Sequence, residues 1–164
     1  MIRKKYGMRI VGPNCLGMIR PNIGLNASFL KLNPKPGNIA FLSQSGQLGD
    51  AILDWGVHAH IGFSMFASLG SMVDVDFGDL IDFLGDDYHT RSIMIYMETV
   101  GDAKKFLSAA RGFARSKPIV VLKPGIFAES AKAVLSHTGS MAGSDAVYDA
   151  ALKRVGIVRV KEVM

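Results

Sequence analysis

Several features are scarce in this chain of 164 residues. Its single cysteine, Cys15, excludes an internal disulfide framework and any metal site built from cysteines alone. No stretch approaches the roughly 20 apolar residues that a membrane-spanning helix needs, and residues 1–6 lack the apolar core of a signal peptide. Charged residues make up 20% of the chain and hydrophobic residues 49%, a balance that excludes intrinsic disorder. We therefore expect a soluble, cytoplasmic protein the size of one ordinary domain, with no membrane as its partner.

Acidic residues are missing from the first third of the chain. Residues 1–49 hold seven basic residues and no Asp or Glu, whereas residues 50–164 hold 12 basic and 14 acidic residues. The formal net charge of +5 therefore belongs to the first third. Such a stretch can attract the phosphates of a nucleic acid or a nucleotide cofactor, or it can be a solvated edge or a contact between domains. No aromatic-rich RNA motif or zinc-finger spacing accompanies it, so we expect no nucleic-acid partner.

Short apolar runs alternate with segments of helical periodicity along most of the chain. The runs predict strands at residues 38–42, 61–67, 92–97, 118–122 and 157–160. Between them, apolar residues recur every three or four positions, as Leu48, Ala51, Ile52 and Trp55 do, which predicts helices with those side chains inward. Strands that alternate with helices form right-handed crossovers and a parallel sheet. The sequence therefore predicts an α/β fold, a flavodoxin-like doubly wound parallel sheet of about five strands with helices on both faces.

Residues 1–37 differ from the rest of the chain. They are basic, and Pro, Gly and Asn residues punctuate residues 21–37, which indicates a loop. We interpret residues 1–37 as a basic lead-in and loop, and residues 38–164 as the domain that holds the sheet.

Polar residues follow the predicted strands at their carboxyl ends, where ligands bind in an open parallel sheet. The first strand is followed by the turn Ser43-Gln44-Ser45-Gly46, directly at a predicted helix start, and the third strand is followed by Glu98. The free N–H groups and the helix dipole at Ser45 and Gly46 favour an anion such as phosphate. The turn lacks the Lys-Ser/Thr ending of a nucleotide-binding P-loop, and it can also be an ordinary helix cap.

One histidine, His137, lies in a segment rich in glycine and hydroxyl residues that follows the fourth predicted strand. Neutral imidazole can act as a nucleophile, and small neighbours leave room for a phosphoryl group. A carboxylate bonded to one ring nitrogen would make the other more nucleophilic, and Glu98 is the acid placed for this role. Two alternatives stay open, namely a surface or hydrogen-bonding histidine and a helix-capping glutamate. His58 and His60 have a spacing that suits a metal ion, but no third ligand is evident, so we expect no metal site.

Several motifs occur in the order that one known family shows. They are Gly12-Pro13-Asn14-Cys15-Leu16-Gly17, Ser43-Gln44-Ser45-Gly46, Ser68-Leu69-Gly70, and Ser136-His137-Thr138-Gly139-Ser140 with Ala142-Gly143-Ser144-Asp145. No single motif is specific, but the ordered set is. Over essentially its whole length the chain resembles the nucleoside-diphosphate-forming acyl-CoA synthetases, the ADP-forming acetyl-CoA synthetase relatives of succinyl-CoA synthetase.

The resemblance implies a reaction in three steps. Acyl-CoA and phosphate give an acyl phosphate, which phosphorylates a histidine, which then phosphorylates ADP. The phosphorylated histidine of the family falls on His137, and the glutamate that orients it falls on Glu98. The other site residues fall on the phosphate-binding Ser45, Gly46, Thr138 and Gly139, and on Asn14 and Cys15 near the CoA thiol. Cys15 can alternatively be a free thiol of the core.

The same resemblance implies partners and cofactors. Family members also carry a CoA-binding Rossmann domain and an ATP-grasp domain or subunit, which bind CoA and ADP or ATP with Mg²⁺, and neither fits in this chain. Residues 38–164 would then be the succinyl-CoA synthetase-like flavodoxin domain, and residues 1–37 would adjoin the CoA-binding domain. The chain would meet acyl-CoA and phosphate but could not complete the reaction alone.

A second interpretation belongs to a different class of function. Fused protein lysine acetyltransferases carry the same kind of domain as an acyl-CoA-sensing regulatory part, and the stretches at residues 75–80 and 144–149 resemble that branch too. His137 could then be retained without phosphoryl transfer. The third interpretation is a flavodoxin-like protein that binds flavin. The absence of a flavin spectrum would exclude it.

Overall fold

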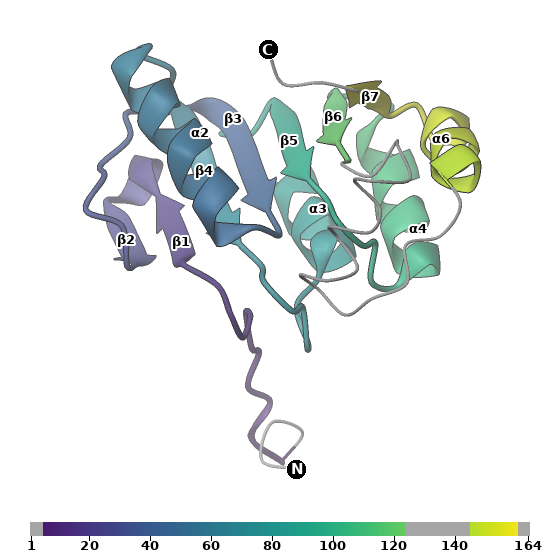
Figure 1. The fold of residues 1–164 in the computed structure, drawn as a ribbon, viewed down its shortest axis with the longest axis horizontal. Coiled ribbons are helices and arrows are strands. Elements are labelled where there is room, and N and C mark those ends of the chain that lie inside the picture. Colours follow the sequence, from purple (N-terminus) through teal and green to yellow (C-terminus); the bar gives the residue numbers. More distant parts are fainter. Residues whose placement is uncertain (1–4, 124–144, 161–164) are drawn as a thin grey trace.

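The computed structural model describes residues 5–123 and 145–160 (Figure 1). The strands are β1 (Gly17–Arg20), β2 (Leu25–Ser28), β3 (Pro36–Ser43), β4 (Phe63–Ser68), β5 (Ser92–Tyr96), β6 (Ile119–Leu122) and β7 (Val158–Val160). The helices are α2 (Gly46–His58), α3 (Phe77–Gly85), α4 (Ala103–Phe113) and α6 (Asp145–Arg154), and a short 3₁₀ helix, η1 (Pro21–Ile23), joins β1 to β2. Within the described residues, no helix has the length and apolar character needed to cross a membrane.

In the described part of the chain, seven strands form one sheet in the order β2-β1-β4-β3-β5-β6-β7. The five strands from β3 to β7 run parallel, and they lie in the order 2-1-3-4-5 when these five alone are numbered along the chain. That is the flavodoxin-like order. β1 pairs antiparallel with both β4 and β2, so the complete sheet is mixed. The predicted α/β fold and its five parallel strands are thus confirmed.

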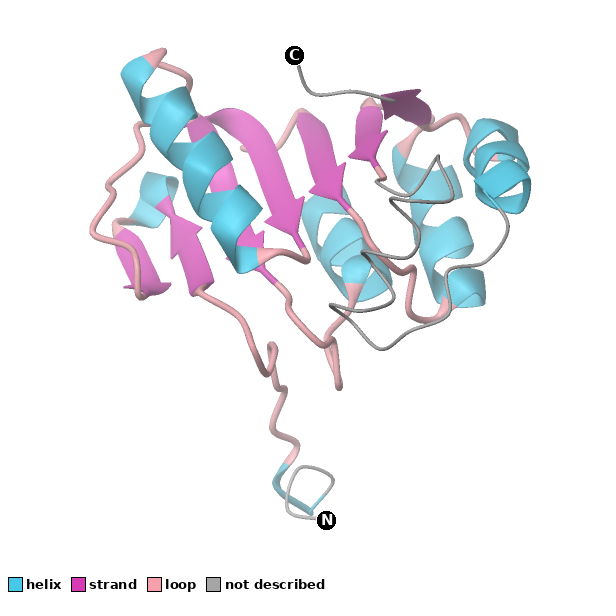
Figure 2. Ribbon diagram, viewed as in Figure 1, coloured by secondary structure: helices cyan, strands magenta, loops and turns pink. Residues whose placement is uncertain are grey.

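Helices cover both faces of the sheet, as the sequence predicts (Figure 2). α2 packs on one face, where Leu53 lies in a buried cluster with Phe66. On the other face α3, α4 and α6 share the larger cluster through Phe77, Phe106 and Leu152. This double layer leaves the carboxyl ends of the parallel strands at one edge, where the connecting loops gather.

The buried side of α2 differs from the prediction. Leu48, Ala51, Ile52 and Trp55 were expected to face inward, but Trp55 is 64% exposed, and the buried residues of the helix are Gly49, Leu53 and Gly56. A Cβ at Gly49 would lie 3.1 Å from the Phe66 ring, and one at Gly56 would lie 2.8 Å from the Phe63 ring. Two glycines therefore let the helix approach the sheet closely, and apolar periodicity does not count glycine as an inward residue.

The prediction of a loop at residues 21–37 is wrong in part, because residues 25–28 form β2 and β3 begins at Pro36. β1 and β2 form a short antiparallel hairpin that extends the sheet beyond β4. Its turn is marked by a proline and a glycine, since η1 begins at Pro21 and ends before Gly24, which has a φ of +65°. The sequences of these two strands, Gly-Met-Ile-Arg and Leu-Asn-Ala-Ser, mix polar and apolar residues, so no apolar run identifies them. The hairpin thus joins part of the predicted lead-in to the sheet, and the boundary at residue 37 stays a prediction.

Candidate functional site

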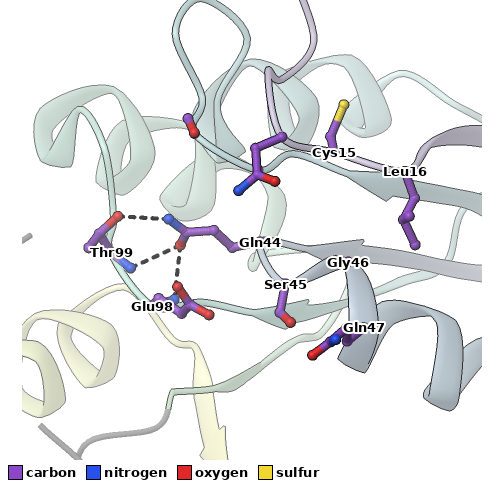
Figure 3. Close-up of a pocket in the computed structure, with 11 residues that line it drawn as sticks. Cys15, Leu16, Gln44, Ser45, Gly46, Gln47, Glu98 and Thr99 are labelled. Atoms are coloured by element: carbon purple, nitrogen blue, oxygen red, sulfur yellow. Dashed lines mark hydrogen bonds between the residues drawn. The ribbon is translucent and has the colours of Figure 1, made fainter. Parts of the chain in front are cut away.

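A pocket of about 700 Å³ opens at the carboxyl ends of β3, β4 and β5 (Figure 3). It is lined by Asn14, Cys15, Leu16, Gln44, Ser45, Gly46, Gln47, Gly70, Ser71, Glu98 and Thr99. In the sheet, β4 lies on one side of β3 and β5 lies on the other. The pocket therefore lies where the strand order reverses, which is where open α/β sheets bind ligands.

The start of α2 forms one wall of the pocket. Ser45 is the N-cap: its hydroxyl accepts a hydrogen bond from Leu48 N at 3.4 Å, and Ser43 Oγ donates to Ser45 O at 2.6 Å. The first turn of α2 itself contains no acidic residue. Its free N–H groups and the positive end of the helix dipole lie at the pocket, because Ser45 and Gly46 both line it. This wall is suited to an anion.

The side chain of Gln44 joins the end of β3 to the turn that follows β5 (Figure 3). Gln44 Oε1 accepts hydrogen bonds from Glu98 N and Thr99 N, both at 2.9 Å, and Gln44 Nε2 donates to Thr99 Oγ1 at 2.9 Å. The backbone adds a bond from Gln44 N to Tyr96 O at 3.0 Å. Glu98 is only 8% exposed. A carboxylate is thus held in the wall of the pocket on a turn that is tied to the neighbouring strand.

Two groups near this carboxylate have shifted pKa values. Burial raises the pKa of the Tyr96 phenol, and the charge of Glu98 raises it further. Burial lowers the pKa of the Lys123 ammonium and Arg159 lowers it further, whereas Asp145 and Glu98 act in the opposite direction. Lys123 follows β6 and is 2% exposed. The same edge of the sheet therefore holds a buried cation as well as a buried carboxylate.

The N-terminal arm, residues 9–16, brings Asn14 and Cys15 to the pocket. Its backbone runs beside the loop that follows β4, where Ser71 N donates to Pro13 O at 2.9 Å. Two further backbone bonds of 3.0 and 3.1 Å join the same two segments. The arm is therefore held against the sheet by bonds like those of a strand pair.

Ion pairs hold the outer end of the N-terminal arm. Arg9 Nε lies 3.1 Å from Asp74 Oδ2, and Arg9 Nη2 lies 3.2 Å from Asp79 Oδ1. Lys105 Nζ, from α4, lies 2.8 Å from both Asp76 Oδ2 and Asp79 Oδ2. Burial raises the pKa of the Asp79 carboxyl, but hydrogen bonds from Lys105, from Asp76 N and from Arg9 outweigh it and leave that pKa below its ordinary value. Asp79 therefore stays ionised and links the arm to α3 and α4.

Gly70 is the point of closest approach between the loop after β4 and the N-terminal arm. Its φ is +54°, and a Cβ there would lie 2.1 Å from Asn14 O and 2.2 Å from Pro13 O. We expect Gly70→Ala to destabilise the chain by about 2–3 kcal/mol, because alanine is strained at positive φ and because the backbone of the arm must move away. Urea unfolding of the wild-type and variant chains measures the difference.

Gly112→Ala provides the matched control for this prediction. Gly112 lies on the exposed side of α4, and a Cβ there would have no described atom beyond its own helix within 4 Å. Alanine is favoured over glycine in a helix, so this variant should match the wild type or exceed its stability by up to about 1 kcal/mol. Equal stabilities for the two variants would contradict the close contact at Gly70.

The structure brings five of the predicted site residues into one pocket. They are Asn14, Cys15, Ser45, Gly46 and Glu98. The other three predicted site residues, His137, Thr138 and Gly139, lie outside the described residues. Within the described residues, no group of three or more His, Cys, Asp and Glu side chains is arranged to hold a metal ion.

Sequence reasoning missed the part that Gln44 takes in the site. It treated the turn as a source of free backbone N–H groups and a helix dipole, and it assigned no contact to the side-chain amide of Gln44. The available signal was position, because Gln44 follows the carboxyl end of a buried strand and directly precedes the N-cap. Its partner Thr99 directly follows Glu98 in the chain.

Comparisons with known proteins agree with one another. The family model for the succinyl-CoA ligase like flavodoxin domain matches residues 36–164. The chain is 47% identical over 156 residues to the alpha subunit of acetate–CoA ligase [ADP-forming] I of Pyrococcus furiosus, covering 95% of this chain and 34% of that subunit. It is 45% identical over 162 residues to acetate–CoA ligase [ADP-forming] I of Archaeoglobus fulgidus, covering 99% of this chain and 24% of that protein.

Solved structures extend the similarity to three dimensions. The dinucleotide-forming acetyl-coenzyme A synthetase 1 of Ca. Korarchaeum cryptofilum, in complex with phosphate and ADP, matches with a TM-score of 0.93 and 42% identity. The match covers 98% of this chain and 35% of that one. The chain thus spans between about a quarter and about a third of the length of these relatives.

Proposed function

Since the chain belongs to the family of succinyl-CoA ligase-like flavodoxin domains, we propose that it is the phosphohistidine-carrying domain of an ADP-forming acyl-CoA synthetase. Acetyl-CoA is the acyl-CoA proposed, because relatives that are 47% and 45% identical to this chain are named as acetate–CoA ligases. The observation that carries the proposal is the pocket, which combines a helix N-terminus with a buried carboxylate. The first favours a phosphoryl group, and the second can orient an imidazole.

The proposed reaction has three steps, and in each, one bond forms as another breaks. A phosphate oxygen attacks the acyl carbon of acetyl-CoA, the carbon–sulfur bond breaks, and CoA leaves. A ring nitrogen of His137 then attacks the phosphorus of the acetyl phosphate, and the phosphorus–oxygen bond to the acetyl group breaks to release acetate. Finally, a terminal phosphate oxygen of ADP attacks the phosphorus of phosphohistidine, and the phosphorus–nitrogen bond breaks, which yields ATP and restores the histidine.

The predicted site residues have proposed roles in this reaction. The N–H groups at Ser45 and Gly46 hold the phosphoryl group, and Glu98 accepts the N–H of the His137 ring and supports the positive charge that develops on it. The arm residues Asn14 and Cys15 line the pocket, and we propose that the acyl thioester binds beside them. By their place in the family motif, Thr138 and Gly139 contribute further donors to the phosphoryl group.

The remaining components are proposed to be held elsewhere. CoA, and ADP or ATP with Mg²⁺, would bind mostly to a CoA-binding Rossmann domain and to an ATP-grasp domain or subunit. When bound with the nucleotide, Mg²⁺ neutralises charge on its phosphates. Cytoplasm is the proposed compartment, where the free thiol of Cys15 stays reduced.

Covalent labelling tests the proposed function. The chain is assembled with the CoA-binding and ATP-grasp parts and incubated with acetyl-CoA and ³²P-phosphate, or with acetyl phosphate labelled on phosphorus. We expect a phosphoryl group on this chain that is labile to acid and stable to base. If the assembled protein takes no label but still binds acetyl-CoA, the regulatory, acyl-CoA-sensing function replaces this one.

A further inference from the structure

We infer that Gln44 is a positioning residue for phosphoryl transfer, which acts by fixing the turn that carries Glu98. The inference rests on the proposed function of the pocket and adds to it a residue that makes no covalent contribution. Gln44 uses both ends of its side-chain amide on one short segment, Glu98–Thr99, at distances of 2.9 Å.

The backbone at this point explains why a side chain is needed. β3 and β5 pair in parallel up to the register Ser43↔Tyr96, and beyond it the chain turns away into α2. Glu98 N and Thr99 N thus lie past the last backbone acceptor that β3 can offer them. Gln44 Oε1 accepts both hydrogen bonds instead, and so continues the ladder by one step through a side chain.

The opposite end of the amide fixes which way Gln44 points. Its Nε2 donates to Thr99 Oγ1, so the oxygen is directed at the two backbone N–H groups and not at solvent. A glutamate in its place could accept the same two bonds, but it would lose this donor and add a second negative charge beside Glu98. The neutral amide therefore holds the turn without disturbing the charge that Glu98 supplies.

The side chain of Glu98 stays available because these bonds go to its backbone. Gln44 bonds Glu98 N, and the carboxylate lines the pocket next to the start of α2 (Figure 3). A carboxylate that orients an imidazole must be correctly placed, since displacements of about 1 Å can cost about a hundredfold in rate. The side chain of Gln44, at the end of β3, makes the three hydrogen bonds that hold the turn of Glu98 in place.

The test compares Gln44→Met, Glu98→Gln and the double variant in the assembled protein, with labelled acetyl phosphate as the phosphoryl donor. Methionine keeps the length of glutamine but removes all three side-chain hydrogen bonds. We expect Gln44→Met to lower the maximal rate of phosphorylation at least about tenfold and to leave the KM for acetyl phosphate unchanged. Because Gln44 acts through Glu98, the double variant should be no slower than Glu98→Gln alone.

Two outcomes overturn the inference. If the two single losses multiply in the double variant, Gln44 acts independently of Glu98. If Gln44→Met raises the KM and leaves the maximal rate intact, Gln44 contacts the substrate and is not a positioning residue.

Amide hydrogen exchange in the chain separates failure of this inference from failure of the proposed function. Gln44→Met should speed exchange at Glu98 N and Thr99 N at least about tenfold while leaving the amides of the central strands protected. Unchanged exchange at those two amides overturns the inference whether or not the wild type is labelled. Absence of label on the wild type, with exchange faster in the variant, counts against the proposed function and leaves the structural part of the inference supported.

Discussion

Replacing His137 with alanine is expected to abolish covalent phosphorylation of the chain. In the proposed relay, the ring nitrogen of His137 is the atom that bonds to phosphorus, and alanine offers no nucleophile in its place. The helix N-terminus at Ser45 can still attract phosphate, but binding alone forms no bond. Electrophoresis of the assembled protein after incubation with ³²P-labelled acetyl phosphate measures the loss, and synthesis of ATP from ADP should disappear with it.

His58→Ala is the matched control for this experiment. His58 is an exposed residue at the end of α2, where its Nδ1 lies 2.9 Å from Asp54 O. It lies outside the pocket, so its removal should leave labelling at the wild-type level. Label that persists in His137→Ala, or that disappears in His58→Ala, would contradict the assignment of the nucleophile.

The fold was largely predictable because its parallel strands are short runs of mostly apolar residues. The apolar run at residues 92–97 predicts a strand, and the structure has β5 there, ending at Tyr96. The hairpin of β1 and β2 was not predictable in this way, since polar residues interrupt the apolar ones in both strands. The inward side of α2 was misjudged for a different reason: Gly49 and Gly56 contact the sheet through the absence of a side chain.

The residues of the site also differ in whether the sequence could predict their place. Ser45, Gly46 and Glu98 could be predicted to share a pocket, because the carboxyl ends of parallel strands meet at one edge. The assignment of Asn14 and Cys15 to the site rested on the family resemblance alone. It could not be derived from the residues, because it depends on tertiary contacts such as that between Pro13 O and Ser71 N. Contacts of that kind leave no periodic pattern.

Removing the negative charge of Glu98 is expected to slow the phosphorylation of His137 about a hundredfold or more. Glu98→Gln removes the negative charge and keeps the size of the side chain. The bonds from Glu98 N and Thr99 N to Gln44 should persist, since they involve only the backbone of the turn. The chain should therefore fold as the wild type does and lose the support that a carboxylate gives to an imidazole as it becomes positively charged.

Rapid-quench labelling with acetyl phosphate measures the rate of the Glu98→Gln variant, and the titration of Tyr96 verifies that the charge has been removed. Because the carboxylate of Glu98 contributes to the raised pKa of Tyr96, the phenol in Glu98→Gln should ionise at lower pH than in the wild type. Tyr96→Phe identifies its part of the phenolate absorbance. If the titration of Tyr96 shifts and the unfolding curve does not, the loss of rate belongs to the charge. Labelling at the wild-type rate under those conditions would remove Glu98 from the relay, because the charge would be gone and the reaction would not have needed it.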